Sequence, residues 1–104
     1  MNRDKNLPLT ETTYYILLAL IEPSHGYLIM QKIEELSNEQ VKIAAGTLYG
    51  ALENLQKQKL IESVKSDDSR RKVYVITDKG REILKLDYER MIRMVSVTKE
   101  LMKL

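Results

Sequence analysis

Apolar residues recur at helical spacing in four segments of this chain and give way to a β-prone segment between the third and the fourth. The first helical segment covers residues 10–22, where Thr10 is a suitable N-cap and Pro23 ends the helix. Its residues are apolar on nearly every side, which is typical of a helix that is buried on more than one face. The pattern therefore predicts a helix covered by several neighbours.

A second helix is predicted over residues 24–36, with Ser24 as its N-cap. Its inward side is expected to be formed by Tyr27 or Leu28, Met30 or Gln31, Ile33 and Leu36. Residues 37–40 have the composition of a loop.

A third helix is predicted over residues 45–58. Leu48, Leu52 and Leu55 lie at positions i, i+4 and i+7, which gives a single apolar stripe. The opposite side is small or polar and consists of Thr47, Gly50, Asn54 and Lys57, with Tyr49 beside it. Such a side leaves room for another molecule to approach closely.

Residues 60–77 contain two short β-prone runs on either side of a polar Asp/Ser tip, which predicts an antiparallel hairpin. The last helix is predicted over residues 78–104, with Thr77 as its N-cap.

The last helix carries two apolar stripes. The first follows heptad spacing and consists of Leu84, Tyr88, Met91, Val95, Thr98 and Met102. The second is confined to the distal half and consists of Met94, Val97, Leu101 and Leu104. One helix cannot bury both stripes against three others, so we expect it to project and to form a homodimer. The expected dimer interface consists of Leu84, Tyr88, Met91, Val95 and Met102.

This element order predicts a mostly α protein with a small β-hairpin: a winged helix-turn-helix over residues 1–80 and a C-terminal dimerisation helix over residues 81–104. The chain has 104 residues, no Cys and a single His, so thiolate metal sites and Cys nucleophiles are excluded. Neither an enzyme, a cofactor nor a metal site is expected. The N-terminus lacks a signal-peptide pattern and the longest apolar run, residues 14–21, is too short for a bilayer, so we expect a cytoplasmic protein with no membrane partner.

The net charge is only +2, but the basic residues are locally clustered. A basic patch can bind phosphate even on a nearly neutral chain, so double-stranded DNA is the expected partner. The third helix would enter the major groove and the hairpin would lie over the flanking backbone. The expected DNA-binding residues are Lys42, Gly46, Thr47, Tyr49, Gly50, Asn54, Arg70, Arg71 and Lys72.

Several of these residues have a second interpretation. Tyr49 could pack against the second helix instead of touching DNA, and the hairpin cations could form an ordinary solvated loop. His25 has neither a catalytic partner nor further metal ligands at suitable spacing, so a structural role at the start of the second helix is favoured over chemistry.

Nearly the whole chain resembles the PadR-like transcriptional regulators. The resemblance is carried in order by His25-Gly26-Tyr27, Gly46-Thr47-Leu48-Tyr49, Leu52-Glu53-Asn54-Leu55 followed by Leu60-Ile61, and residues 70–80. It implies a member of the short subfamily, whose members are two-fold dimers with one long helix after the wing. It also implies that a flat aromatic compound could bind between paired C-terminal helices, as in multidrug sensors of the family.

The chain departs from the family pattern at two places. Ala44 and Ala45 stand where many relatives have a capping Ser, Thr or Asn, so phosphate or water is expected to satisfy the first N–H groups of the third helix. Met91 stands where a related sensor has Trp. The expected ligand-binding residues are Tyr15, Asp87, Tyr88, Met91 and Val95, with an ordinary dimer core as the alternative.

The leading hypothesis is a repressor that binds a pseudo-palindromic operator as a homodimer and is released by a small hydrophobic or aromatic effector. The alternative is a winged-helix protein-interaction module without direct DNA readout.

Overall fold

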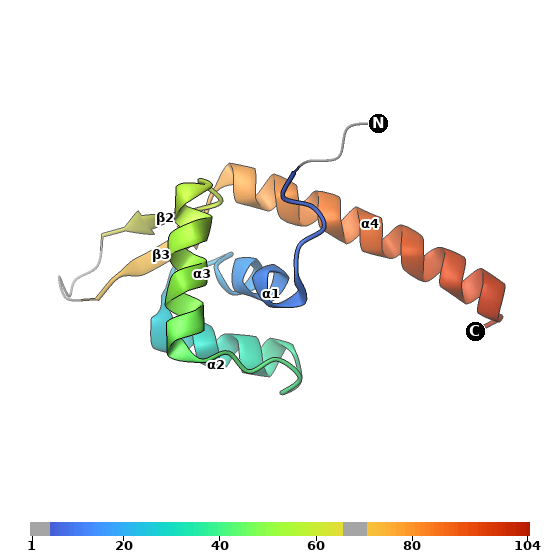
Figure 1. Ribbon diagram of the computed structural model, residues 1–104, viewed down its shortest axis with the longest axis horizontal. Coiled ribbons are helices and arrows are strands. Elements are labelled where there is room, and N and C mark those ends of the chain that lie inside the picture. Colours follow the sequence, from blue (N-terminus) through green and yellow to red (C-terminus); the bar gives the residue numbers. More distant parts are fainter. Residues whose placement is uncertain (1–4, 66–70) are drawn as a thin grey trace.

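The computed structural model describes residues 5–65 and 71–104, which form helices, a small sheet and one projecting helix (Figure 1). In chain order the elements are α1 (Glu11–Ala19), β1 (Ser24–His25), α2 (Gly26–Leu36), α3 (Ala45–Lys57), β2 (Ile61–Val64), β3 (Val73–Ile76) and α4 (Asp78–Met102). The first three helices and the sheet pack around one core, while the distal part of α4 extends away from it. The predicted fold class is confirmed. None of the helices in the described ranges combines the length and apolar character needed to cross a bilayer.

Helix α1 lies at the centre of the core and is capped by Thr10, whose hydroxyl oxygen accepts a hydrogen bond from the Thr13 N–H at 3.1 Å. The helix ends at Ala19, three residues before the predicted end. The carbonyl of Leu20 accepts the N–H of Ile76 at 2.8 Å, and the carbonyl of Ile21 accepts the Arg81 guanidinium at 3.3 Å. These bonds join the end of α1 to β3 and α4.

The sheet has three strands in the order β1-β3-β2, all antiparallel. The predicted hairpin is present: Ile61 pairs with Ile76 and Val64 pairs with Val73. Its predicted tip, residues 66–70, lies outside the described residues.

The expectation that Ser24 caps the second helix is wrong. Ser24 lies in β1 opposite Tyr74 of β3 and is buried. Helix α2 therefore begins at Gly26, and His25 occupies the N-cap position without a side-chain cap. The strand was not predicted because residues 24 and 25 pair with a strand that comes almost fifty residues later. A strand of two residues is also too short to show a hydrophobic pattern of its own.

The inward side of α2 is formed by Ile29 and Ile33, which are fully buried. Leu36, expected on that side, is exposed, and so are Tyr27 and Leu28. In α3 the predicted stripe of Leu48, Leu52 and Leu55 is buried, which leaves the opposite side of this helix free.

Helix α3 ends in a tight turn that is joined to the start of α4. Lys59 has a φ of 64°, and the N–H groups of Lys59 and Leu60 donate to the carbonyls of Gln56 and Leu55, which is the Schellman arrangement. The next carbonyls are taken by α4: Thr77 Oγ1 donates to Lys59 at 2.7 Å, and Lys79 Nζ donates to Gln58 at 3.2 Å.

Gly80 completes this junction. The N–H of Gly80 donates to Thr77 Oγ1 at 3.0 Å, which confirms Thr77 as the N-cap of α4. A Cβ at residue 80 would overlap the carbonyl oxygen of Leu60 and the side chain of Ile76. The absence of a side chain at Gly80 therefore allows α4 to begin directly against the end of α3.

Gly80→Ala is expected to destabilise the fold by about 2 kcal/mol, because the added methyl meets backbone that has little freedom to move. Gly50→Ala is the matched control, since a Cβ at residue 50 meets nothing within 4 Å and the helical position gains roughly 1 kcal/mol. The measurement is urea unfolding followed by circular dichroism. Equal stability of the two variants would contradict the close contact at Gly80.

Candidate nucleic-acid interface

The outward side of α3 begins with two glycines, Gly46 and Gly50. Both are exposed, and a Cβ built at either position meets nothing within 4 Å. The fold therefore requires neither glycine, although each costs about 1 kcal/mol of helix propensity relative to alanine. Without side chains at these two positions the backbone of α3 is exposed here, and another molecule can approach it closely.

Tyr49 lies beside this stripe and packs over the start of α2. A Cβ at Gly26 would overlap the Tyr49 hydroxyl group and ring, so the ring covers Gly26 closely. At the same time 53% of Tyr49 is exposed. The packing expected as the alternative is present, with the hydroxyl end of the ring over Gly26, and about half of the residue is still exposed to a partner.

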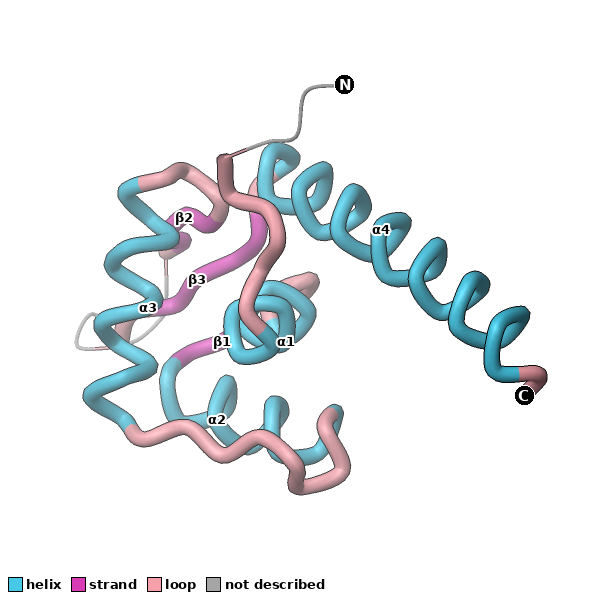
Figure 2. Tube along the Cα trace, turned by 45° about the vertical axis from the view of Figure 1, so that its right-hand side comes forward, coloured by secondary structure: helices cyan, strands magenta, loops and turns pink. Residues whose placement is uncertain are grey.

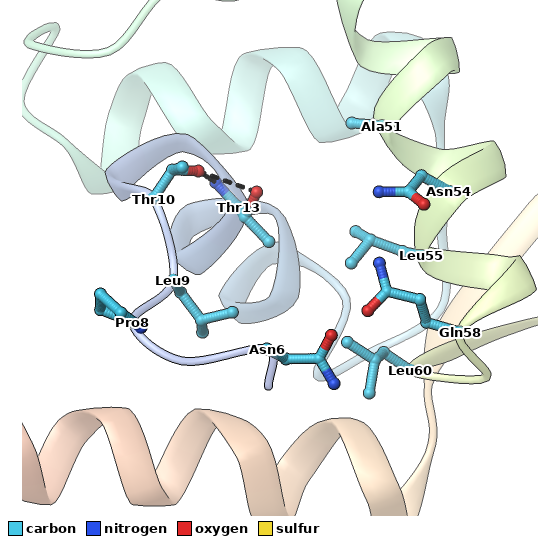
Figure 3. Close-up of a pocket in the computed structure, with 10 residues that line it drawn as sticks. All are labelled: Asn6, Pro8, Leu9, Thr10, Thr13, Ala51, Asn54, Leu55, Gln58 and Leu60. Atoms are coloured by element: carbon cyan, nitrogen blue, oxygen red, sulfur yellow. Dashed lines mark hydrogen bonds between the residues drawn. The ribbon is translucent and has the colours of Figure 1, made fainter. Parts of the chain in front are cut away.

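Thr47 and Asn54 are exposed on the other flank of α3. Asn54 lines a small hollow of about 170 Å³ between α3, the start of α1 and the N-terminal arm (Figure 3). The hollow is lined by Asn6, Pro8, Leu9, Thr10, Thr13, Ala51, Asn54, Leu55, Gln58 and Leu60. Asn54 and Tyr49 thus lie on opposite flanks of the helix, with the glycines between them.

The wing formed by β2 and β3 lies beside α3 (Figure 2). Arg71 and Lys72 precede β3, are exposed, and border a hollow of about 950 Å³ together with residues of α2 and α3. The hollow is lined by His25, Gly26, Tyr27, Tyr49, Glu53, Gln56, Arg71, Lys72 and Tyr74. The third predicted cation, Arg70, lies outside the described residues.

Two residues of α3 that line this hollow, Glu53 and Gln56, were absent from the predicted set. Gln56 donates from Nε2 to Ser63 Oγ at 3.2 Å and so connects α3 to the wing strand β2. Glu53 lies one turn after Tyr49 on the same flank. Their spacing of four and seven residues from Tyr49 could have identified both.

Lys42 lies in the connector before α3, and its Nζ is 3.7 Å from the Oε1 atom of Glu34. Both side chains are largely exposed, and such pairs contribute no more than about 1 kcal/mol. Lys42 can therefore exchange this partner for a phosphate at little cost.

Ala44 is the N-cap residue of α3 and provides no side-chain cap, as the sequence predicts. Ala44, Ala45 and Gly46 are all exposed. The first amides of α3 are thus accessible at the positive end of the helix dipole, where anions are favoured.

Helix α4 contains a buried charge where it crosses α1. Asp87 is 1% exposed and accepts a hydrogen bond from Arg90 Nε at 2.6 Å. This hydrogen bond raises the pKa of Arg90, while burial and the Asp87 charge together raise the pKa of Tyr14 on α1. Asp87, expected among the ligand-binding residues, thus lies in an ion pair inside the chain's own fold.

The other residues predicted for a ligand or a dimer lie in different environments. Leu84 is 7% exposed and belongs to the core, and Tyr15 is partly buried against the core. Tyr88 borders a shallow apolar groove between α1 and α4, whereas Met91 and Val95 share a hollow further along α4.

The distal part of α4 has a large exposed apolar surface. Its members are between 48% and 76% exposed: Tyr88, Ile92, Met94, Val95, Val97, Leu101, Met102 and Leu104. They include all four residues of the second predicted stripe and three of the six residues of the first, Tyr88, Val95 and Met102. Within the described ranges, no group of three or more metal-ligating side chains comes together.

The arrangement of three helices, a wing and an open side on the third helix defines a winged helix-turn-helix protein. The family model described as "Transcriptional regulator PadR-like family" matches residues 16–86. The chain therefore belongs to the PadR-like family of transcriptional regulators.

Solved structures agree with this assignment. A transcriptional regulator from Clostridium thermocellum is 30% identical, with a TM-score of 0.70 over 85% of each chain. A PadR-like transcriptional regulator from Bacillus cereus is 29% identical, with a TM-score of 0.72 over 88% of this chain and 90% of that chain. An uncharacterised 37.1 kDa protein of transposon TN4556 from Streptomyces fradiae is 34% identical over 80 residues, which cover 76% of this chain and 22% of that protein.

Proposed function

We propose that this PadR-like regulator is a repressor that binds a pseudo-palindromic DNA operator as a homodimer. The observation that carries the proposal is the open glycine stripe of α3 beside the exposed cations Arg71 and Lys72. A helix of this kind fits the major groove, and cations at its flank suit the adjacent phosphates.

In the proposed complex, the glycines at 46 and 50 bring the backbone of α3 close to the base edges. The uncapped amides after Ala44 donate to a phosphate, and the exposed half of Tyr49 contacts DNA from the flank. Arg71 and Lys72 neutralise phosphates of the neighbouring backbone. Binding is therefore expected to weaken steeply with salt.

The homodimer is supported by the distal half of α4. An isolated helical segment of this kind, little more than a dozen residues long, is marginally stable in water, and its apolar residues are exposed among the described parts of the chain. A second copy with the same stripes would cover them by symmetric packing. The two α3 helices would then lie one DNA turn apart, about 34–36 Å.

Repression follows from occupancy, because a dimer lying over successive grooves of a promoter excludes polymerase. We further propose that a small hydrophobic or aromatic effector binds beside Tyr88, Met91 and Val95 at the dimer axis. Such a ligand would release DNA only if it prefers a different spacing of the two α3 helices.

Arg71→Ala is expected to weaken binding to all duplexes by a similar factor and to reduce the log–log salt slope by about one, because one phosphate contact is lost. The measurement is fluorescence anisotropy with duplexes from the DNA upstream of the gene, over a series of salt concentrations. Arg93→Ala is the control, since Arg93 shares the exposed polar side of α4 with Glu89, Ser96 and Glu100. An unchanged slope for Arg71→Ala would contradict its phosphate contact. If the wild-type protein shows no salt-dependent duplex binding, a protein-interaction module is favoured instead.

Gly50→Ala is expected to bind the operator roughly tenfold more weakly while the free protein becomes more stable. The added methyl fills space that the fold leaves open but that a close DNA approach requires. Thermal unfolding and operator titration of the same preparation test both effects. Undiminished affinity in the stabilised variant would show that α3 does not approach DNA at this position.

Val95→Glu is expected to convert the homodimer to a monomer, because it places charge in the middle of the apolar surface of α4. Val95 is 61% exposed in the single chain, so the substitution leaves the core intact. Sedimentation velocity measures the association state, and circular dichroism checks the fold. A wild-type protein that remains monomeric at micromolar concentration would refute the proposed dimer.

A further inference from the structure

The outward stripe of α3 contains a carboxylate where a polyanion is proposed to bind. The stripe follows positions i, i+4, i+7 and i+11 and consists of Gly46, Gly50, Glu53 and Lys57. Because the first two members have no side chain, Glu53 is the first side chain on this line that can reach into a groove.

The Glu53 carboxylate is not needed by the fold. Within the described residues its ion-pair partner is Lys57, with Nζ 3.7 Å from Oε1, and the side chains of Glu53 and Lys57 are 72% and 75% exposed. An exposed pair at this spacing contributes about 0.3–0.5 kcal/mol to a helix. The carboxylate is therefore free to change partners when another molecule docks.

A phosphate cannot be that partner, because the two charges repel each other. Glu53 lines the same hollow as Arg71 and Lys72, which suit phosphates. A carboxylate in the same surface reduces affinity for DNA in general, so its useful contact must be with a base edge. In the major groove, the N4 amino group of cytosine is a donor that Glu accepts well.

We infer that Glu53 selects a C·G base pair at one position of each operator half-site by accepting a hydrogen bond from the cytosine N4 amino group, an assignment that rests on the proposed DNA-binding function. Thymine O4 and guanine O6 and N7 would place acceptors opposite the carboxylate. Adenine offers an amino group, but its N7 acceptor lies directly beside it. Glu53 thus acts largely by rejecting the other three bases.

The test begins with selection from a randomised double-stranded DNA library by the wild-type protein, followed by sequencing. The same selection is made with Glu53→Ala, Glu53→Gln and the control Glu35→Gln, which changes an exposed carboxylate near the end of α2. Competition anisotropy then compares the selected duplex with its three single-pair variants at the affected position. Urea unfolding of each variant confirms that the fold is retained.

The wild type and Glu35→Gln are expected to prefer one C·G pair per half-site by about tenfold, and Glu53→Ala should lose that preference. Glu53→Ala should also bind unselected DNA more tightly than the wild type, since a repulsive charge is gone. Glu53→Gln should accept adenine as readily as cytosine, because an amide can pair with both N6 and N7 of adenine.

Two outcomes overturn the assignment: an unchanged preference in Glu53→Ala, or a change confined to a position where the wild type does not select cytosine. If neither the wild type nor the variants enrich any duplex, the proposed DNA-binding function fails first, so the two failures are distinguishable.

Discussion

The geometry of this protein depends on the junction where α3 ends and α4 begins. The carbonyls that α3 leaves unsatisfied at its C-terminus, those of Gln58 and Lys59, accept hydrogen bonds from Lys79 and Thr77, while Gly80 admits the first turn of α4 beside the Leu60 carbonyl. These two hydrogen bonds, together with the close packing at buried Gly80, fix both the position and the direction of α4. The helix proposed to enter DNA and the helix proposed to pair two chains are thus parts of one rigid corner, and a change in the angle between paired α4 helices would be transmitted to both α3 helices.

The proposed functional face combines the outward stripe of α3, where two glycines precede Glu53 and Lys57, with a flank that is basic. The net charge of +2 gives little long-range attraction, so the proposed DNA binding would rely on a few cations placed where phosphates would lie. The open side of α3 has a different role, since Gly46 and Gly50 contribute shape and not charge. General affinity and base choice are therefore assigned to separate elements, the wing and α3. Selection by Glu53 would work by lowering affinity for wrong sequences. The cations of the wing, Arg71 and Lys72, would offset the general loss of DNA affinity that this carboxylate causes.

Features set by local periodicity could be predicted from the sequence, and features set by distant backbone partners could not. The stripe of α3, the caps at Thr10 and Thr77 and the hairpin are all visible in neighbouring residues. The strand at Ser24 was missed because its partner, β3, comes from the other half of the chain. The burial of Asp87 was missed for a related reason, because Asp87 is buried where α4 meets α1. Nothing in the neighbouring sequence tells whether an acidic residue on an apolar side of a helix is buried or exposed. In the candidate site, the residue types were visible, but the hollow that joins α3 to the wing exists only once the sheet has formed.

The shape of the small sheet also bears on how the protein behaves in concentrated solution. Within the described residues the middle strand, β3, pairs with a strand along each of its edges, so β1 and β2 are the edge strands. The first edge has two residues and follows Pro23, which has no N–H to offer, and the second has four residues, with exposed Glu62 next to Ser63. Short edges with proline or charge are poor templates for strands of another molecule. The proposed association between copies would thereby be directed to helical surfaces, and the described strands of the wing offer a poor starting point for aggregation.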